Sequence, residues 1–200
     1  QYVHYVPLPQ SIVRDITIRY ARSFCNNCDQ IIVPTKEIER IVEGFNVKTP
    51  ISVIPTGVQL NKFISGDKNW LRKRYNIPPE NRILLFVGRL CREKNLFFLL
   101  ESFKLVKEKN PRVSLVLTAG GPLEEELKAF AAELGLDLDR EVIFTGALPF
   151  EQLKNVYHSA DLFVFASLTE TQGLVLLEAM ASGLPVVAVR ASGVQDMVDH

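Results

Sequence analysis

The stretch LFVFASLTETQGLVLLEAMASGLPVVAV, residues 162–189, decides the fold. It contains an apolar strand over 162–166, a loop, an apolar helix over about 173–182 and a second apolar strand over 185–189. Strands that are apolar along their whole length are typical of parallel sheets with helices on both faces. Gly183 and Pro185 separate the helix from the second strand, as expected at a helix end. The stretch therefore predicts a strand–helix–strand unit of an α/β protein.

The same alternation extends back to about residue 82. Further strands are expected over 83–87, 113–118 and 142–144, and helices over 96–109, 123–134 and 150–160. Residues 82–200 are therefore predicted to form a Rossmann-like parallel sheet with helices on both faces. Because His200 falls inside what reads as the start of another helix, we expect this domain to be truncated.

The first 60 residues have a different pattern. A helix over about 11–25, a strand over 30–33 and a helix over about 35–45 lead into ISVIPTGV, residues 51–58. Residues 61–81 are polar, basic and rich in turn formers, which favours a connection between domains. We expect three parts: the tail of a first domain over 1–60, a connection over 61–81 and a second domain over 82–200.

Composition limits the function classes. A formal net charge of zero argues against a nucleic-acid binder that relies on bulk charge. Residues 61–110 hold 12 Lys and Arg against 5 Asp and Glu, which indicates either an anionic ligand or an ordinary solvated basic face. No apolar run approaches the ~20 residues that cross a bilayer, and the start has no signal-peptide pattern. Three cysteines leave one unpaired under any disulfide scheme, so a reducing cytoplasm is expected. Cys25 and Cys28 have CxxC spacing without a second pair, and we expect buried thiols there rather than a metal site.

Basic residues and a helix start mark the predicted binding site. Ligands of open α/β sheets bind outside the carboxyl ends of the strands. The strand over 83–87 ends at Gly88 and Arg89, and Lys94 follows before a helix. Arginine can bind two phosphate oxygens and lysine supplies a point charge, while a helix start near Gly173 offers free N–H groups to a phosphate. Glu178, about two turns into that helix, can accept hydrogen bonds from sugar hydroxyls, so the pattern predicts a nucleotide-sugar site.

Five motifs, in this order and spacing, resemble those of the retaining family 4 glycosyltransferases, which have the GT-B fold: GRLCREKN (88–95), TAGGP (118–122), VIFTGALPFEQL (142–153), the pair Tyr157 and Asp161, and ETQGLVLLEAMASGLPVV (170–187). The resemblance implies that Glu170 faces the donor sugar, that Glu178 binds the ribose, and that Arg89 and Lys94 hold the diphosphate. Glu170, Arg89 and Lys94 are thus the expected catalytic residues. The implied donor site comprises Gly88, Arg89, Lys94, Gly146, Ala147, Leu148, Thr171, Gln172, Gly173, Leu174 and Glu178.

A narrower resemblance is to the bacterial diacylglycerol glucosyltransferases of membrane glycolipid synthesis. It is carried by IIVPTKEI (31–38), VIPTGVQLNKF (53–63) and ETQG (170–173), while HYVPLPQ (4–10) and RSFCNNCD (22–29) look like the end of their acceptor domain. It implies transfer of a hexose from UDP-glucose to diacylglycerol with retention at the anomeric carbon, without a cofactor or metal. The expected location is the cytoplasm or the inner face of the membrane. Arg14, Arg19 and Arg22 lie on one predicted helix, where they either meet anionic lipid headgroups or form an ordinary exposed face. Residues 1–200 alone are expected to bind nucleotide but to have little activity.

Several alternatives stay open. One alternative is a glycosyltransferase that acts on a soluble sugar or a polysaccharide with another donor. A non-catalytic nucleotide-sugar-binding subunit or a nucleotide-sugar epimerase would share many of these features. A nicotinamide oxidoreductase is disfavoured, because FVGRLCREK lacks the glycine-rich fingerprint. Asp137 and Asp139 form a DxD, but their place before a strand predicts a solvated turn at the amino edge of the sheet. His4 is expected at the domain edge or near the acceptor, and His158 at a helix end or on the surface.

Overall fold

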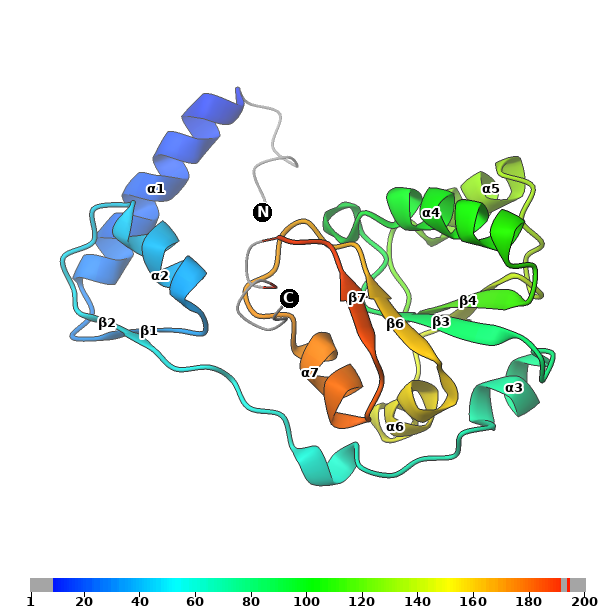
Figure 1. Cartoon of the computed structure of the whole chain (residues 1–200). Coiled ribbons are helices and arrows are strands. Elements are labelled where there is room, and N and C mark those ends of the chain that lie inside the picture. Colours follow the sequence, from blue (N-terminus) through cyan, green and yellow to red (C-terminus); the bar gives the residue numbers. More distant parts are fainter. Residues whose placement is uncertain (1–8, 192–193, 195–200) are drawn as a thin grey trace. The chain divides into compact units, whose positions relative to one another are not determined.

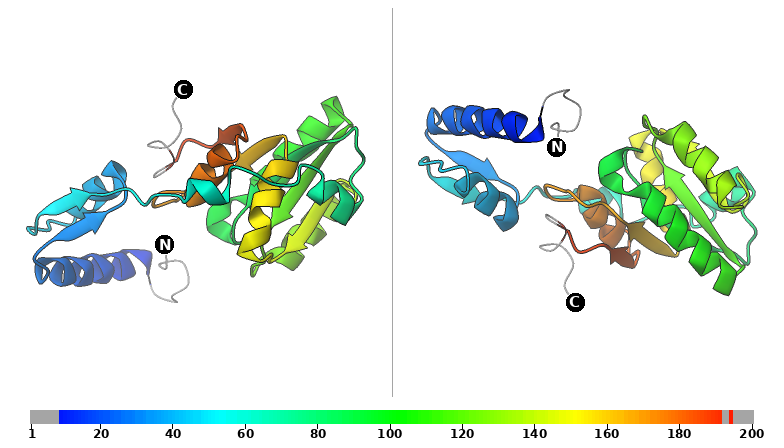
Figure 2. Two further views of the ribbon diagram at one scale, coloured as in Figure 1. Left: turned by 90° about the horizontal axis from the view of Figure 1, so that it is seen from below. Right: turned by 90° about the horizontal axis from the view of Figure 1, so that it is seen from above.

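The computed structural model describes residues 9–191 and residue 194, which form two compact units (Figures 1 and 2). Unit 1 comprises the described residues up to Gly57, the segment 169–172 and the described residues from Ala191 onward. Unit 2 comprises residues 58–168 and 173–190. The predicted position of His4 and the predicted helix start near His200 lie outside the described residues.

Within its described residues, unit 1 contains a parallel pair of short strands and two helices. Helix α1 spans Gln10–Asn26, β1 Ile31–Val33, α2 Lys36–Glu43 and β2 Ile51–Val53, and Ile31 pairs with Ile51. The predictions of α1, β1 and α2 are confirmed to within about two residues at each end, whereas β2 was not predicted as a strand. Helix α2 begins after Thr35, whose hydroxyl accepts a hydrogen bond from the Ile38 N–H (3.3 Å) and so caps the helix.

Unit 2 is built on a five-stranded sheet in the order β5-β4-β3-β6-β7, and every pair of neighbours is parallel. The strands span Arg82–Val87 (β3), Val113–Thr118 (β4), Val142–Gly146 (β5), Leu162–Phe165 (β6) and Val186–Ala188 (β7). Strand β4 is buried at every residue, which explains its uninterrupted run of apolar and small side chains. All five strands were predicted from the sequence.

The helices of unit 2 cover both faces of this sheet (Figure 1). Helices α4 (Leu96–Lys109) and α5 (Glu124–Glu133) lie on one face, and α6 (Phe150–Ser159) and α7 (Leu174–Ala181) lie on the other. Right-handed crossovers require this division, because the chain moves outward from β3 to β5 and then returns across the sheet to β6 and β7. The predicted fold class, a Rossmann-like parallel sheet with helices on both faces, is confirmed.

Residues 61–81 are more structured than the sequence suggested. They contain most of the short helix η2 (Leu60–Lys62) and the whole of α3 (Trp70–Tyr75), and both lie in unit 2. Phe63 and Leu71 from this segment are fully buried, and Phe63 makes edge contacts with the rings of Phe150 and Tyr157. Helix α3 was missed. None of the helices in the described part of the chain is long and apolar enough to cross a membrane.

Candidate functional site

Most of the predicted site residues of unit 2 follow β3 and β6, where the strand order of the sheet reverses. From β3 the chain proceeds outward to β4 and β5 on one side, and β6 and β7 occupy the other side. The carboxyl ends of β3 and β6 are therefore adjacent, while the connections that leave them pass to opposite faces. Open α/β sheets bind ligands in the crevice at such a point.

The connection after β3 is shaped by Gly88. Its φ of 155° is rare for residues with a side chain, and a Cβ atom there would lie 3.1 Å from the Phe86 ring. The Gly88 N–H donates to the Thr118 carbonyl (3.0 Å), so the chain leaves β3 beside the end of β4. Arg89 follows with an exposed side chain. The guanidinium thus stands at the carboxyl edge, where the sequence predicted a phosphate-binding cation.

Main-chain hydrogen bonds tie the loops at this edge together. The Leu90 N–H donates to the Gly120 carbonyl (3.2 Å), which joins the loops after β3 and β4. The Ala119 N–H donates to the carbonyl of Gly146 at the end of β5 (3.1 Å). Ala147, which is exposed, and the half-buried Leu148 continue from there. Main-chain hydrogen bonds therefore fix the loops that carry these predicted donor-site residues.

Lys94 lies at the end of the short helix η3 (Arg92–Lys94) and leans toward β6. Its Nζ is 5.6 Å from the centroid of the Phe165 ring, within the range of a cation–π contact. The carbonyl of Glu93 accepts hydrogen bonds from the Ser167 hydroxyl (3.0 Å) and the Leu168 N–H (3.1 Å). The η3 turn is thereby fixed to the end of β6. Sequence reasoning missed this role of Glu93, because its partners lie more than 70 residues away.

Glu178 is held by a buried phenol. Helix α7 begins after Gly173, and Glu178 lies half-buried in its second turn. The hydroxyl of Tyr157, a fully buried residue of α6, donates to Glu178 Oε2 at 2.7 Å. Burial raises the pKa of Glu178, and the Tyr157 hydrogen bond acts against that rise. Burial and then the Glu178 charge raise the pKa of Tyr157 well above its usual value, so the phenol stays a donor.

Removing the Tyr157 hydroxyl should change how stability depends on pH. We expect Tyr157→Phe to cost about 1 kcal/mol of unfolding free energy, the usual net value of one hydrogen bond. Because the pKa of Glu178 is raised in the folded state, protonation of Glu178 favours folding, and the native state gains stability as pH falls through that pKa. Without the phenol this gain should be larger and begin at higher pH. Urea unfolding across pH measures it, and a profile equal to that of the control Tyr75→Phe would contradict the assignment.

The segment 169–172, which carries three of the predicted residues, belongs to unit 1. Glu170 is half-buried and Thr171 is exposed. The Gln172 side chain is buried, with its amide bonded to the main chain of Thr56. The predicted site residues are thus divided between the units: Gly88, Arg89, Lys94, Gly146, Ala147, Leu148, Gly173, Leu174 and Glu178 in unit 2, and Glu170, Thr171 and Gln172 in unit 1.

The rival motifs lie away from the carboxyl edge. Asp137 and Asp139 are exposed in the turn before β5, at the amino edge as predicted. His158 lies in the last turn of α6 as predicted, but it is half-buried with Nε2 2.8 Å from the Phe63 carbonyl oxygen. Cys25 and Cys28 are half-buried free thiols. Within the described ranges, no group of three or more His, Cys, Asp or Glu side chains could hold a metal ion.

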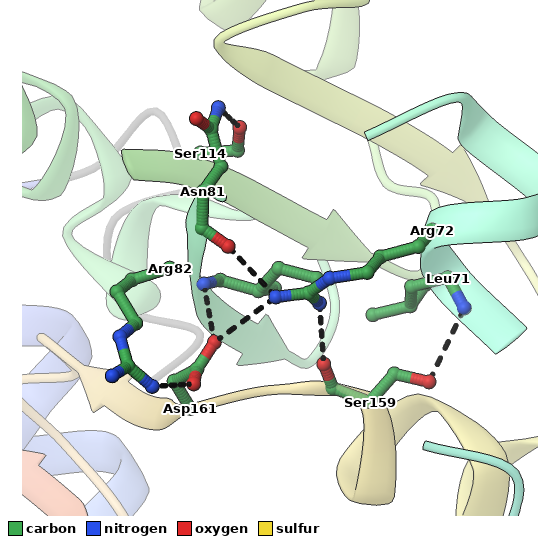
Figure 3. Close-up of polar contacts among 8 residues, drawn as sticks. Leu71, Arg72, Asn81, Arg82, Ser114, Ser159 and Asp161 are labelled. Carbon is green, nitrogen blue, oxygen red and sulfur yellow. Dashed lines mark hydrogen bonds and ion pairs between the residues drawn. The ribbon is translucent and has the colours of Figure 1, made fainter. Parts of the chain in front are cut away.

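A polar cluster occupies the amino edge of the same sheet (Figure 3). Asp161, just before β6, accepts hydrogen bonds from the Ile83 N–H (2.8 Å) and from Arg82 (2.7 Å). Arg72 of α3 donates to the carbonyls of Asn81 (2.7 Å) and Ser159 (3.3 Å), and it lies 3.6 Å from Asp161. A cavity of about 700 Å³ borders this cluster. Because the protein's own groups satisfy its charges, the cluster fixes α3 to the sheet.

Comparison with known proteins identifies the family. Residues 67–200 match the family described as Glycosyl transferases group 1, and residues 1–62 match Glycosyltransferase Family 4. The chain belongs to the group 1 glycosyl transferases. The resemblance to family 4 glycosyltransferases inferred from the motifs is confirmed.

Individual relatives agree with this assignment. The chain is 34% identical over 193 residues to the alpha-monoglucosyldiacylglycerol synthase of Streptococcus pneumoniae, covering 94% of this chain and 43% of that protein. It is 36% identical over 186 residues to the D-inositol 3-phosphate glycosyltransferase of Corynebacterium jeikeium, covering 87% of this chain and 44% of that protein. The crystal structure of Anabaena HepE in complex with UDP-glucose shares the fold, with a TM-score of 0.82, 22% identity and coverage of 92% of this chain and 51% of HepE. The chain thus spans about half the length of these proteins or less.

Proposed function

We propose that the full-length protein is a retaining glycosyltransferase that moves a hexose from a nucleotide-diphosphate sugar to an acceptor. The observation that carries the proposal is the carboxyl edge of unit 2, where Arg89, Lys94 and the start of α7 follow the adjacent strands β3 and β6. The bond to the leaving nucleoside diphosphate breaks with growth of negative charge on its phosphate oxygens. Fixed cations and helix N–H groups stabilise such charge best when they are already in place.

The acidic residues take complementary roles in this proposal. Glu178, with one oxygen occupied by the Tyr157 hydroxyl, offers the other to the ribose hydroxyls. Glu170 faces the donor sugar as a positioning carboxylate, and departing phosphate assists removal of the acceptor proton. Gly146, Ala147 and Leu148 pass near the base, while the N–H groups of Gly173 and Leu174 meet the diphosphate. No metal or cofactor takes part.

The donor and acceptor are proposed from the relatives. We infer diacylglycerol as acceptor, because the pneumococcal relative is a monoglucosyldiacylglycerol synthase and the motifs resemble that group, and UDP-glucose as donor, because the structurally similar HepE binds UDP-glucose. In this proposal residues 1–60 form the last part of the acceptor domain, residues 61–81 connect the two domains, and residues 82–200 belong to the donor domain. The protein acts in the cytoplasm at the inner membrane face. Arg14 and Arg19 of α1 are exposed and suited to anionic lipid, whereas Arg22 donates to the Phe45 carbonyl (2.5 Å) and is half-buried.

A second acceptor class has support of its own. The corynebacterial relative, which acts on D-inositol 3-phosphate, is as similar to this chain as the glycolipid enzyme. Incubating the full-length protein with UDP-glucose and either diacylglycerol vesicles or inositol 3-phosphate separates the two. Glycolipid formation supports the proposal, and glycosylation of inositol phosphate alone would replace it with the second candidate.

Nucleotide titration tests the site itself. We expect Arg89→Ala and Glu178→Ala each to weaken UDP binding about tenfold, about 1.4 kcal/mol, because each removes a charge-assisted hydrogen bond. Lys68→Ala is the matched control, since Lys68 is an exposed cation bordering the amino-edge cavity. Isothermal titration calorimetry measures the three affinities. If Lys68→Ala weakens UDP binding and the other two variants do not, the nucleotide binds at the amino edge of the sheet, and the proposed site is wrong.

A further inference from the structure

The loop Thr169–Gln172 is short but tightly held within unit 1. It lies between Leu168 and Gly173, the residue before α7, and it carries Glu170. It groups with the N-terminal residues up to Gly57, although the residues on either side of it belong to unit 2. The contacts that hold this loop in unit 1 therefore decide where the main chain of Glu170 lies within that unit.

The first contact is a two-point pairing between Gln172 and Thr56. Gln172 Oε1 accepts a hydrogen bond from the Thr56 N–H (3.0 Å), and Gln172 Nε2 donates to the Thr56 carbonyl (2.7 Å). The Gln172 side chain is 3% exposed, so water cannot replace either bond freely. A carboxamide has both the donor and the acceptor that this pairing requires, and asparagine is one methylene too short to span it.

The second contact comes from Thr35. Its hydroxyl donates to the carbonyl of Thr171 (3.1 Å) while it accepts from the Ile38 N–H (3.3 Å). Thr35 is 3% exposed, so one buried hydroxyl both caps α2 and fixes the peptide between Thr171 and Gln172, in the loop that carries Glu170. A buried polar group that loses its partner costs more than the bond contributes when made.

We propose that Gln172 is a positioning residue for Glu170, assisted by Thr35. In this proposal its amide acts on the main chain of Thr56, in place of the donor contact that the family resemblance implies for it. The proposal rests on the proposed role of Glu170 at that sugar. The ETQG signature then has a physical meaning: glutamic acid supplies the carboxylate, and glutamine two residues later anchors the loop that presents it.

The substitution Gln172→Glu tests the pairing, because it preserves shape and removes one donor. An ionised carboxylate would face the Thr56 carbonyl oxygen, while a protonated one again donates to it and accepts from the Thr56 N–H. In the full-length protein we expect kcat to fall about tenfold near pH 8 and to recover toward wild type near pH 5.5, with UDP affinity changed less than about twofold. Gln59→Glu, the same change at an exposed glutamine, is the matched control and should show neither effect.

Substitutions of Thr35 separate loop positioning from helix capping. Aspartate is a good N-cap acceptor but, when ionised, has no hydrogen for the Thr171 carbonyl. Thr35→Asp should therefore still cap α2 but lose kcat, with a loss of stability because its carboxylate is buried against the Thr171 carbonyl, whereas Thr35→Ser, which keeps both bonds, should retain both kcat and stability. Loss of kcat in Thr35→Ser, or wild-type kcat in Thr35→Asp, would overturn the part assigned to Thr35.

Hydrogen exchange at the Thr56 amide gives a readout that does not need activity. Relative to wild type at the same pH, exchange of the peptide around residue 56 should accelerate in Gln172→Glu near pH 8, where repulsion from the Thr56 carbonyl opens the pairing, and return to the wild-type rate near pH 5.5. Equal exchange in wild type and variant at both pH values, or a wild-type kcat at pH 8, would overturn the inference. If the wild type transfers no sugar at all, the proposed function fails, and the exchange experiment still decides whether Gln172 anchors the loop.

Discussion

Replacing Gly121 by alanine is expected to destabilise the protein by about 3 kcal/mol, the upper end for overpacking a well-packed site. A Cβ atom at position 121 would lie 2.7 Å or less from three main-chain atoms of Leu90. Backbone fills this space, so no side chain can rotate away. The Leu90 carbonyl also accepts the Leu123 N–H (3.1 Å), and any shift of Leu90 would strain that bond. Urea unfolding of the purified variant measures the loss.

The neighbouring glycine is the matched control. A Cβ atom at Gly120 would meet only Glu124 Oε2, at 3.6 Å, an ordinary contact. Gly120→Ala should therefore change stability by less than about 0.5 kcal/mol. Gly121→Ala should also weaken UDP binding, because Leu90 directly follows Arg89, and Gly120→Ala should not. Equal stability of the two variants would show that the loops after β3 and β4 are not closely packed.

Gly120 and Gly121 illustrate which parts of the fold can be predicted from the sequence and which cannot. The run Gly120-Gly121-Pro122 predicted a turn before a helix, and α5 does begin after it, at Glu124. Which glycine is indispensable could not be predicted, because the obstacle is the main chain of Leu90, about 30 residues earlier in the sequence. The strands were predictable for a different reason: burial on both faces leaves an apolar run that is visible locally.

Helix α3 was missed for a related reason. It has six residues, too few for a helical period to be visible, and Leu71 is its only buried residue in the structure as described. Its position depends on distant groups: the Leu71 N–H donates to the Ser159 hydroxyl (3.2 Å), and Arg72 bonds to the Asn81 carbonyl (2.7 Å). From the sequence alone, this basic and polar segment was therefore predicted as a connection without a helix.

The sequence predicts which residues form the candidate site, but not the contacts that hold their side chains in place. Arg89 and Lys94 follow the end of β3, and the structure brings Lys94 to Phe165 of β6. Tyr157 and Asp161 were recognised only through a family resemblance. Their partners, Glu178 and Ile83, are 21 and 78 residues away in the sequence, so their separate roles needed coordinates.

Loss of the Asp161 carboxylate is expected to destabilise the protein by about 2–3 kcal/mol, within the range for leaving a buried donor unpaired. In Asp161→Ala the N–H of the fully buried Ile83 loses its acceptor, and the half-buried Arg72 loses its carboxylate partner (Figure 3). The ion pair with Arg82 should add little, because the Arg82 side chain is 72% exposed. Asp29→Ala, which removes an exposed carboxylate, should cost less than about 0.5 kcal/mol.

The pH dependence of the Asp161 effect identifies its cause. Burial alone would raise the pKa of Asp161, but the Ile83 N–H and the two arginines outweigh burial and lower it. A folded-state pKa below the unfolded value means that the carboxylate stabilises the protein above about pH 4 and that this contribution is lost as pH falls through the folded pKa. The wild type and Asp161→Ala should therefore differ most near neutral pH and converge in acid. A constant difference from neutral pH into acid would show that Asp161 acts through packing and not through its charge.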